Sequence, residues 1–123
     1  MSNGFVRVDS LAIDCADPPR LAEFWQQVIG GTLEVDSDGD IWLHSEGLSL
    51  IFTTVPEDKT VKNRLHLDLR GDTYEEAIAR ALELGATRAD DIYDGDRWQV
   101  LRDPEGNEFC ILRPRPAASP ANS

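Results

Sequence analysis

One order of elements occurs twice along the chain, and this repeat constrains the fold more than any other feature of the sequence. The stretch SLAIDCAD, residues 10–17, aligns with HLDLRGDT, residues 66–73. Each stretch is followed by a helical pattern that ends at glycine and then by three strand-like segments. Self-similarity of this kind is typical of a duplicated supersecondary unit. We therefore expect an α+β fold of two tandem βαβββ modules, in which a curled sheet surrounds a cleft and the helices lie outside.

The first module carries the strongest periodic pattern in the chain. Residues 5–15 are rich in β-branched and apolar side chains, and Asp17 precedes Pro18 as expected at a helix start. Apolar residues then recur at helical spacing between Leu21 and Ile29, and two glycines follow. Turn residues separate three further strand-like segments, at residues 32–35, 41–44 and 48–54.

The second module begins with a strand at residues 64–70, after a polar segment. Thr73 and Glu76 fit a capping box at the start of a helix, and Gly85 marks the end of that helix. The turn 103–106 joins the last two strands. Three strands are expected after the helix, at residues 86–92, 97–102 and 108–112.

Chain length predicts one domain. A chain of 123 residues can bury a core without disulfides, so we expect a single domain over residues 1–114. Module one spans about residues 5–54 and module two about residues 64–112. Residues 115–123, rich in proline and small side chains, are expected to form a flexible tail.

Charge and cysteine usage exclude several classes of partner. The formal net charge of −11 opposes binding to nucleic acid, and no apolar run reaches the roughly 18 residues that a membrane span needs. Only two cysteines occur, and the amino terminus lacks a secretory signal pattern. We therefore expect reduced thiols in a cytoplasmic protein.

Strand alternation predicts which side chains share a surface. Along residues 64–70 the leucines should face a helix, and the polar residues should face the opposite side. In the last strand, Phe109 and Ile111 have the parity of core residues, which places Cys110 on the other face. His66 and Cys110 are therefore expected to line one surface. The polar residues on the shared face of residues 64–70 are Arg64, His66, Asp68 and Arg70.

The stretches VKNRLHLDLRGDT and RWQVLRDPEGNEFCIL, together with the duplication, resemble the vicinal-oxygen-chelate superfamily. This superfamily includes glyoxalases, bleomycin-resistance proteins and extradiol dioxygenases. The resemblance covers about residues 5–114 and is closest to a glyoxalase-like branch. It implies a small-molecule ligand and a homodimer, and in the metal enzymes a divalent ion that chelates two neighbouring substrate oxygens.

The resemblance also implies where metal ligands would stand: at Ser10 and His66 in the first strands, near Thr53, and at Cys110 in the last strand. A serine hydroxyl binds divalent ions poorly, and Cys110 replaces an expected carboxylate. Imidazole and thiolate suit zinc, yet a catalytic zinc site usually has three protein ligands. We therefore expect no cofactor, with zinc, iron, manganese or nickel bound by His66 and Cys110 as the alternative.

Each cleft candidate has a functional and a structural interpretation. His66 is either a ligand or base, or a hydrogen-bonded wall residue, and Cys110 is either a ligand or nucleophile, or an apolar filler. Asp68 either orients a polar ligand or pairs with a neighbouring cation. The acidic run 89–96 is expected to be a solvated loop. The candidates for the ligand-binding cleft are Ser10, Trp42, His66, Asp68, Arg70, Trp98 and Cys110.

Three functions follow. The first is binding of a small organic molecule without a conventional metal site. The second is a metal-dependent lyase, isomerase or dioxygenase, and the third is a non-catalytic interaction or regulatory protein. The departures at Ser10 and Cys110 favour the first function, while the sequence leaves open whether the chain is an enzyme and which residues are catalytic.

Overall fold

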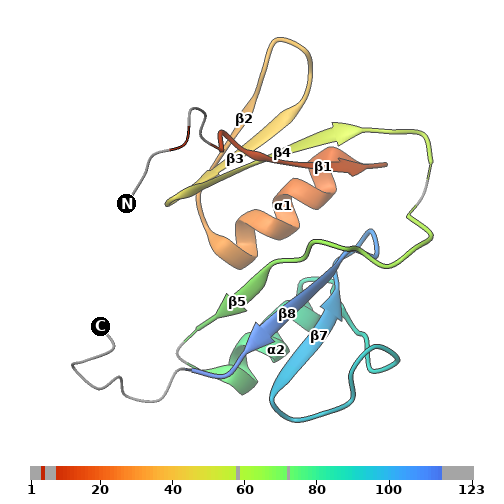
Figure 1. Ribbon diagram of the computed structural model, residues 1–123. Helices are drawn as coiled ribbons and strands as arrows, with labels where there is room; N and C mark the ends of the chain where they lie inside the picture. The colour runs from red at the N-terminus through yellow and green to blue at the C-terminus, as the bar shows by residue number, and fades with distance from the viewer. Residues whose placement is uncertain (1–3, 5–7, 58, 72, 115–123) are drawn as a thin grey trace. The chain divides into compact units, whose positions relative to one another are not determined.

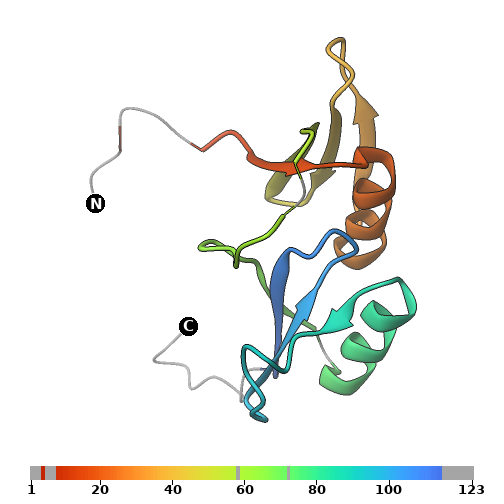
Figure 2. The same ribbon diagram turned by 90° about the vertical axis from the view of Figure 1, so that its right-hand side faces the viewer.

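The computed structural model describes residue 4 and residues 8–57, 59–71 and 73–114. The chain divides into two compact units, Met1–Lys59 and Thr60–Ser123. Each unit contains one described helix and one open four-stranded sheet, in the order βαβββ (Figures 1 and 2). The predicted α+β fold with two tandem modules is confirmed. The predicted tail, at residues 115–123, and residues 5–7 of the first strand predicted over residues 5–15 lie outside the described residues. Residues 8–10 were also predicted as strand, but the strand begins at Leu11.

The first unit packs its helix against the sheet through large apolar side chains. The Asp17 side chain accepts a hydrogen bond from the Arg20 N–H at 3.3 Å, as expected of a cap, and Leu21 is fully buried. Leu50 and Phe52 are fully buried in the sheet. The sheet order is β1-β4-β3-β2, with β1 parallel to β4. The elements are β1 (Leu11–Cys15), α1 (Pro18–Ile29), β2 (Thr32–Val35), β3 (Ile41–Ser45) and β4 (Leu48–Thr54).

The second unit repeats this arrangement, with the sheet order β5-β8-β7-β6 and β5 parallel to β8. Its helix lies against one face of the sheet (Figure 2). Leu101 and Phe109 are fully buried and directly paired, whereas their neighbours Val100 and Cys110 pack in a separate apolar cluster. The elements are β5 (Asp68–Arg70), α2 (Tyr74–Glu83), β6 (Thr87–Arg88), β7 (Trp98–Arg102) and β8 (Glu108–Leu112).

Three local predictions for the second unit were wrong. The strand expected at residues 64–70 is limited to β5, and Leu65 is 85% exposed instead of packed on a helix, because β8 begins at Glu108 and offers residue 65 no paired strand residue. The strand expected at residues 86–92 is limited to β6, because the chain turns where the Ile92 N–H bonds to a carbonyl three residues earlier. Thr73 makes no side-chain cap, although the helix does begin after it.

Two hairpin turns, at different places in the two modules, have the same hydrogen bonds. In the turn 103–107, the buried Asp103 accepts hydrogen bonds from the backbone N–H groups two and four positions later, both at 2.9 Å. In the turn 36–40, Asp36 does the same at 2.9 and 3.0 Å. The fourth residue of each turn is a glycine with positive φ. Both modules therefore use one carboxylate to fix the register of a hairpin.

No helix in the described part of the chain combines the length and the apolar character needed to cross a membrane.

We predict that Asp103→Ala lowers the free energy of unfolding by about 1–3 kcal/mol, because it leaves partly buried N–H groups without their acceptor. Urea denaturation measures this change. Asp38→Ala is the control, since Asp38 is exposed and contributes only its backbone N–H to the turn with the same hydrogen bonds at Asp36. The control should change stability by less than about 0.5 kcal/mol. Equal losses in both variants would contradict the role of the Asp103 carboxylate.

Candidate functional site

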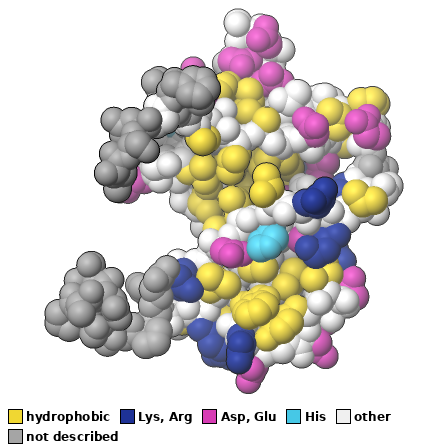
Figure 3. Space-filling view, in the orientation of Figure 1, with side chains coloured by type: hydrophobic (Ala, Val, Ile, Leu, Met, Phe, Trp, Pro, Cys, Tyr) yellow, Lys and Arg dark blue, Asp and Glu magenta, His cyan; other side chains and the backbone are white. Residues whose placement is uncertain are grey.

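The sheet of the second unit carries a pocket of about 440 Å³. Figure 3 shows hydrophobic side chains gathered on this unit beside a histidine and an acidic side chain. The apolar part of the lining consists of Ile92, Tyr93, Trp98, Val100 and Leu112. The polar part consists of Lys62, His66, Asp68, Glu108 and Cys110.

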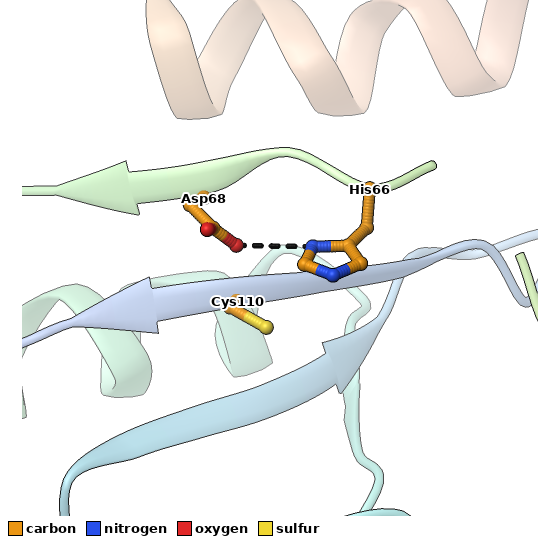
Figure 4. A group of neighbouring side chains, drawn as sticks. All are labelled: His66, Asp68 and Cys110. Carbon is orange, nitrogen blue, oxygen red and sulfur yellow. Dashed lines mark ion pairs between the residues drawn. The ribbon is translucent and has the colours of Figure 1, made fainter. Parts of the chain in front are cut away.

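Strand pairing brings His66, Asp68 and Cys110 together, as Figure 4 shows. Asp68 lies directly opposite Cys110 in the parallel ladder between β5 and β8, and His66 precedes Asp68 by two residues. His66 Nδ1 lies 3.0 Å from Asp68 Oδ1. One nitrogen, one carboxylate oxygen and one sulfur from the three residues lie within 4.8 Å of one another. The structure thus places His66, Asp68 and Cys110 in one lining.

The Cys110 side chain is protonated at neutral pH. Burial, the negative charge of Asp68 and a hydrogen bond to that carboxylate raise the pKa of the Cys110 thiol to about 11, while the Lys62 cation acts in the opposite direction. Because the thiolate and not the thiol attacks electrophiles and binds metal ions, the side chain must lose its proton before it can do either.

Glu108 holds the segment that leads into the site. Its side chain is almost completely buried, and its Oε1 accepts a hydrogen bond from the backbone N–H of Asn63 at 2.7 Å. Its Oε2 lies 3.6 Å from Nε of Arg102. This contact ties the segment that carries Lys62 and His66 to β8. The sequence indicated Glu108 through strand alternation, because Glu108 and Cys110 are two residues apart on one strand and therefore share a face.

An aromatic pair forms the opposite part of the lining. The rings of Tyr93 and Trp98 stack at 4.2 Å between centroids with an interplanar angle of 13°. The sequence left Trp98 open between core and ligand wall, and the structure places it half-buried in the pocket lining. Ile92 and Tyr93 were missed because they lie within the acidic run that predicted a solvated loop. The signal for them was two adjacent apolar side chains inside that run.

The other sequence candidates lie outside the lining of this pocket. Trp42 belongs to the first unit, where its Nε1 donates a hydrogen bond to Asp36 at 2.9 Å and its ring stacks on His44. Ser10 precedes β1 in the first unit. Arg70 lies on β5, and its Nε donates a hydrogen bond to the backbone carbonyl of Arg113 at 2.9 Å.

The first unit has different side chains at the positions that correspond to the cluster. The repeat aligns Ser10 with His66 and Ala12 with Asp68. Ala12 pairs with Ile51 across β1 and β4, as Asp68 pairs with Cys110, so Ile51 and not Thr53 corresponds to Cys110. The hydroxyl, methyl and branched alkyl groups at these positions are not a metal-binding set.

A family model described as a glyoxalase-like domain matches residues 10–112, and the chain belongs to this family. The fold is shared with solved structures of the same superfamily. A glyoxalase/bleomycin resistance protein/dioxygenase family enzyme from Burkholderia phytofirmans PsJN is 23% identical, with a TM-score of 0.68 over 85% of this chain and 95% of that one. The genomically encoded fosfomycin resistance protein FosX from Listeria monocytogenes is 12% identical, with a TM-score of 0.67 over 91% and 94% of the two chains.

A hypothetical protein from S. aureus is similar to the same extent, with 14% identity and a TM-score of 0.68 over 89% of this chain and 95% of that chain. At these identities the similarity shows the fold alone. No curated protein has significant sequence similarity to the chain.

Members of the superfamily often use a divalent metal, and the donor set of the second unit is compatible with one. Imidazole nitrogen, carboxylate oxygen and thiolate sulfur are the three kinds of donor that bind zinc in proteins. Their atoms lie within 4.8 Å of one another in the second unit. His66, Asp68 and Cys110 are therefore the residues that would hold the ion.

We predict that alkylation of Cys110 by iodoacetamide is slow at neutral pH and accelerates as the pH approaches about 11, where the thiolate forms. Asp68→Asn should shift this profile to lower pH, because it removes a negative charge that opposes thiolate formation. Burial, the largest cause, remains, so the profile should stay above that of an ordinary cysteine. Mass spectrometry of the modified peptide separates Cys110 from Cys15. A profile that Asp68→Asn leaves unchanged would contradict this coupling.

Proposed function

We propose that this protein binds a small organic molecule in the pocket of its second unit. The observation that supports the proposal most strongly is a cavity of about 440 Å³ that combines an apolar, partly aromatic wall with a few convergent polar groups. Ligand pockets of proteins have this size and this composition.

The sheet order separates the two kinds of contact that a ligand would make. Asp68 lies on the edge strand β5, Trp98 lies on β7, and β8 runs between them. A flat apolar ring fits against the stacked pair Tyr93 and Trp98. A polar substituent of the same molecule can then reach His66 and Asp68, which are already paired with each other. The ligand class is therefore a small aromatic or heteroaromatic compound with one polar group.

A metal-dependent lyase, isomerase or dioxygenase reaction is the second candidate function. The cluster of His66, Asp68 and Cys110 favours it. A divalent ion bound there would act as a Lewis acid toward neighbouring oxygens of a substrate. The aromatic wall would hold the apolar part of that substrate in the same pocket.

Homodimer formation, a cytoplasmic location and a single domain over residues 1–114 stay predictions from the sequence.

We predict that a thermal-shift screen of small aromatic acids, amines and phenols identifies compounds that raise the melting temperature, because ligands of the folded state stabilise it. For each compound confirmed by calorimetry, Trp98→Ala should weaken binding about tenfold, which corresponds to about 1.4 kcal/mol. Trp98→Phe should retain most of the affinity, because it keeps an aromatic ring in the wall.

Trp42→Ala is the matched control, because Trp42 is the half-buried tryptophan of the hairpin in the first unit. The affinity of the Trp42→Ala variant for the same compounds should stay within about twofold of the affinity of the unmodified protein, a difference of less than about 0.5 kcal/mol. A screen without binders, or equal losses in the Trp98 and Trp42 variants, would contradict binding in this pocket.

A further inference from the structure

The superfamily resemblance takes metal ligands from the first strands of both modules, but the donors in this chain come from one module alone. We propose that His66, Asp68 and Cys110 form a zinc site contained entirely within the second module. Asp68 supplies the third ligand that the resemblance did not assign, and the first-module position, Ser10, is not needed. This site differs from the superfamily pattern in the identity of its ligands and in the fact that one module supplies all of them.

The backbone already holds two of the donors in place. Asp68 and Cys110 are opposite each other in the parallel ladder, and the Cys110 N–H bonds to the carbonyl of Leu67 at 2.9 Å. Donors around tetrahedral zinc are roughly 3.5 Å apart, given bond lengths of about 2.0–2.3 Å. The donor atoms of the three residues lie within 4.8 Å of one another. Side-chain rotation therefore suffices to bring them around one ion.

The donor set favours zinc over the harder cations. A cysteine sulfur binds zinc well and magnesium, calcium or manganese poorly. On binding, the Cys110 thiol releases its proton to solvent and its sulfur forms the bond to the ion. Asp68 and Cys110 then carry one negative charge each, which together neutralise the charge of Zn²⁺. Three protein ligands leave a fourth position for water or for a ligand in the pocket.

A second pair of histidine and carboxylate provides an internal comparison. In the first unit, His44 Nε2 lies 2.7 Å from Glu34 Oε1, and His44 Nδ1 lies 3.1 Å from the Ser49 hydroxyl. This pair resembles that of His66 and Asp68 but has a hydroxyl where the second unit has a thiol. A site that depends on sulfur should therefore form around His66 and not around His44.

The test uses the full chain, without a histidine tag, titrated with Co²⁺ as a spectroscopic substitute for Zn²⁺. We expect one ion per chain and an absorption band for charge transfer from thiolate to cobalt. Cys110→Ala and Cys110→Ser should abolish this band. His66→Ala and Asp68→Ala should weaken Zn²⁺ binding at least tenfold in competition with a chelating dye. Circular dichroism establishes that each variant is folded, and Asp68→Asn provides a second variant of unchanged size.

Cys15→Ala and His44→Ala are the matched controls, because Cys15 is the second cysteine and His44 the second histidine of the sequence. Both should retain the charge-transfer band and the affinity. The absence of a stoichiometric ion, a band that persists in Cys110→Ala, or equal losses in the controls would overturn the site. Because the titration contains metal alone, its result is independent of whether the pocket binds an organic compound.

Discussion

The parallel pairing of β5 with β8 is the interaction on which the rest of the second unit depends. These two strands are far apart in sequence, and their register places Asp68 opposite Cys110. A shift of one residue would turn every side chain of β5 to the other face of the sheet. The polar cluster would then point toward the helix, and the leucine of β5 would point into the pocket. Register, more than residue type, makes this face a candidate site.

The overall fold was accessible from the sequence because its signals are local and occur twice. Asp17 before Pro18, the helical apolar spacing and the glycines at helix ends each specify an element without distant contacts. The strand predicted at residues 64–70 was too long, because the length of this strand depends on its pairing with β8, about forty residues later in the sequence. Strand alternation correctly grouped His66 with Cys110. Strand alternation did not predict that Tyr93 lines the pocket, because the position of Tyr93 depends on the stacking of its ring on Trp98.

The two modules have kept their framework and diverged in their surfaces. The sheet orders are equivalent, and the parallel ladders between β1 and β4 and between β5 and β8 have matching registers. The framework positions are fixed by backbone groups that need a partner wherever they are buried. The positions of Ser10, Ala12 and Ile51 lie on a face without that constraint. The first module therefore keeps the fold without the polar cluster that the second module carries.

The contact between Glu108 and Asn63 is part of a longer chain of interactions. Arg102 pairs with Glu108 at 3.6 Å and with Asp91 at 2.7 Å, so one guanidinium joins two carboxylates. Asp91 lies in the loop that carries Tyr93, and Asn63 lies beside Lys62. Two rims of the pocket, contributed by segments about thirty residues apart, are therefore tied through a single arginine. Displacement of either rim would therefore strain a contact of Arg102 that also holds the other rim.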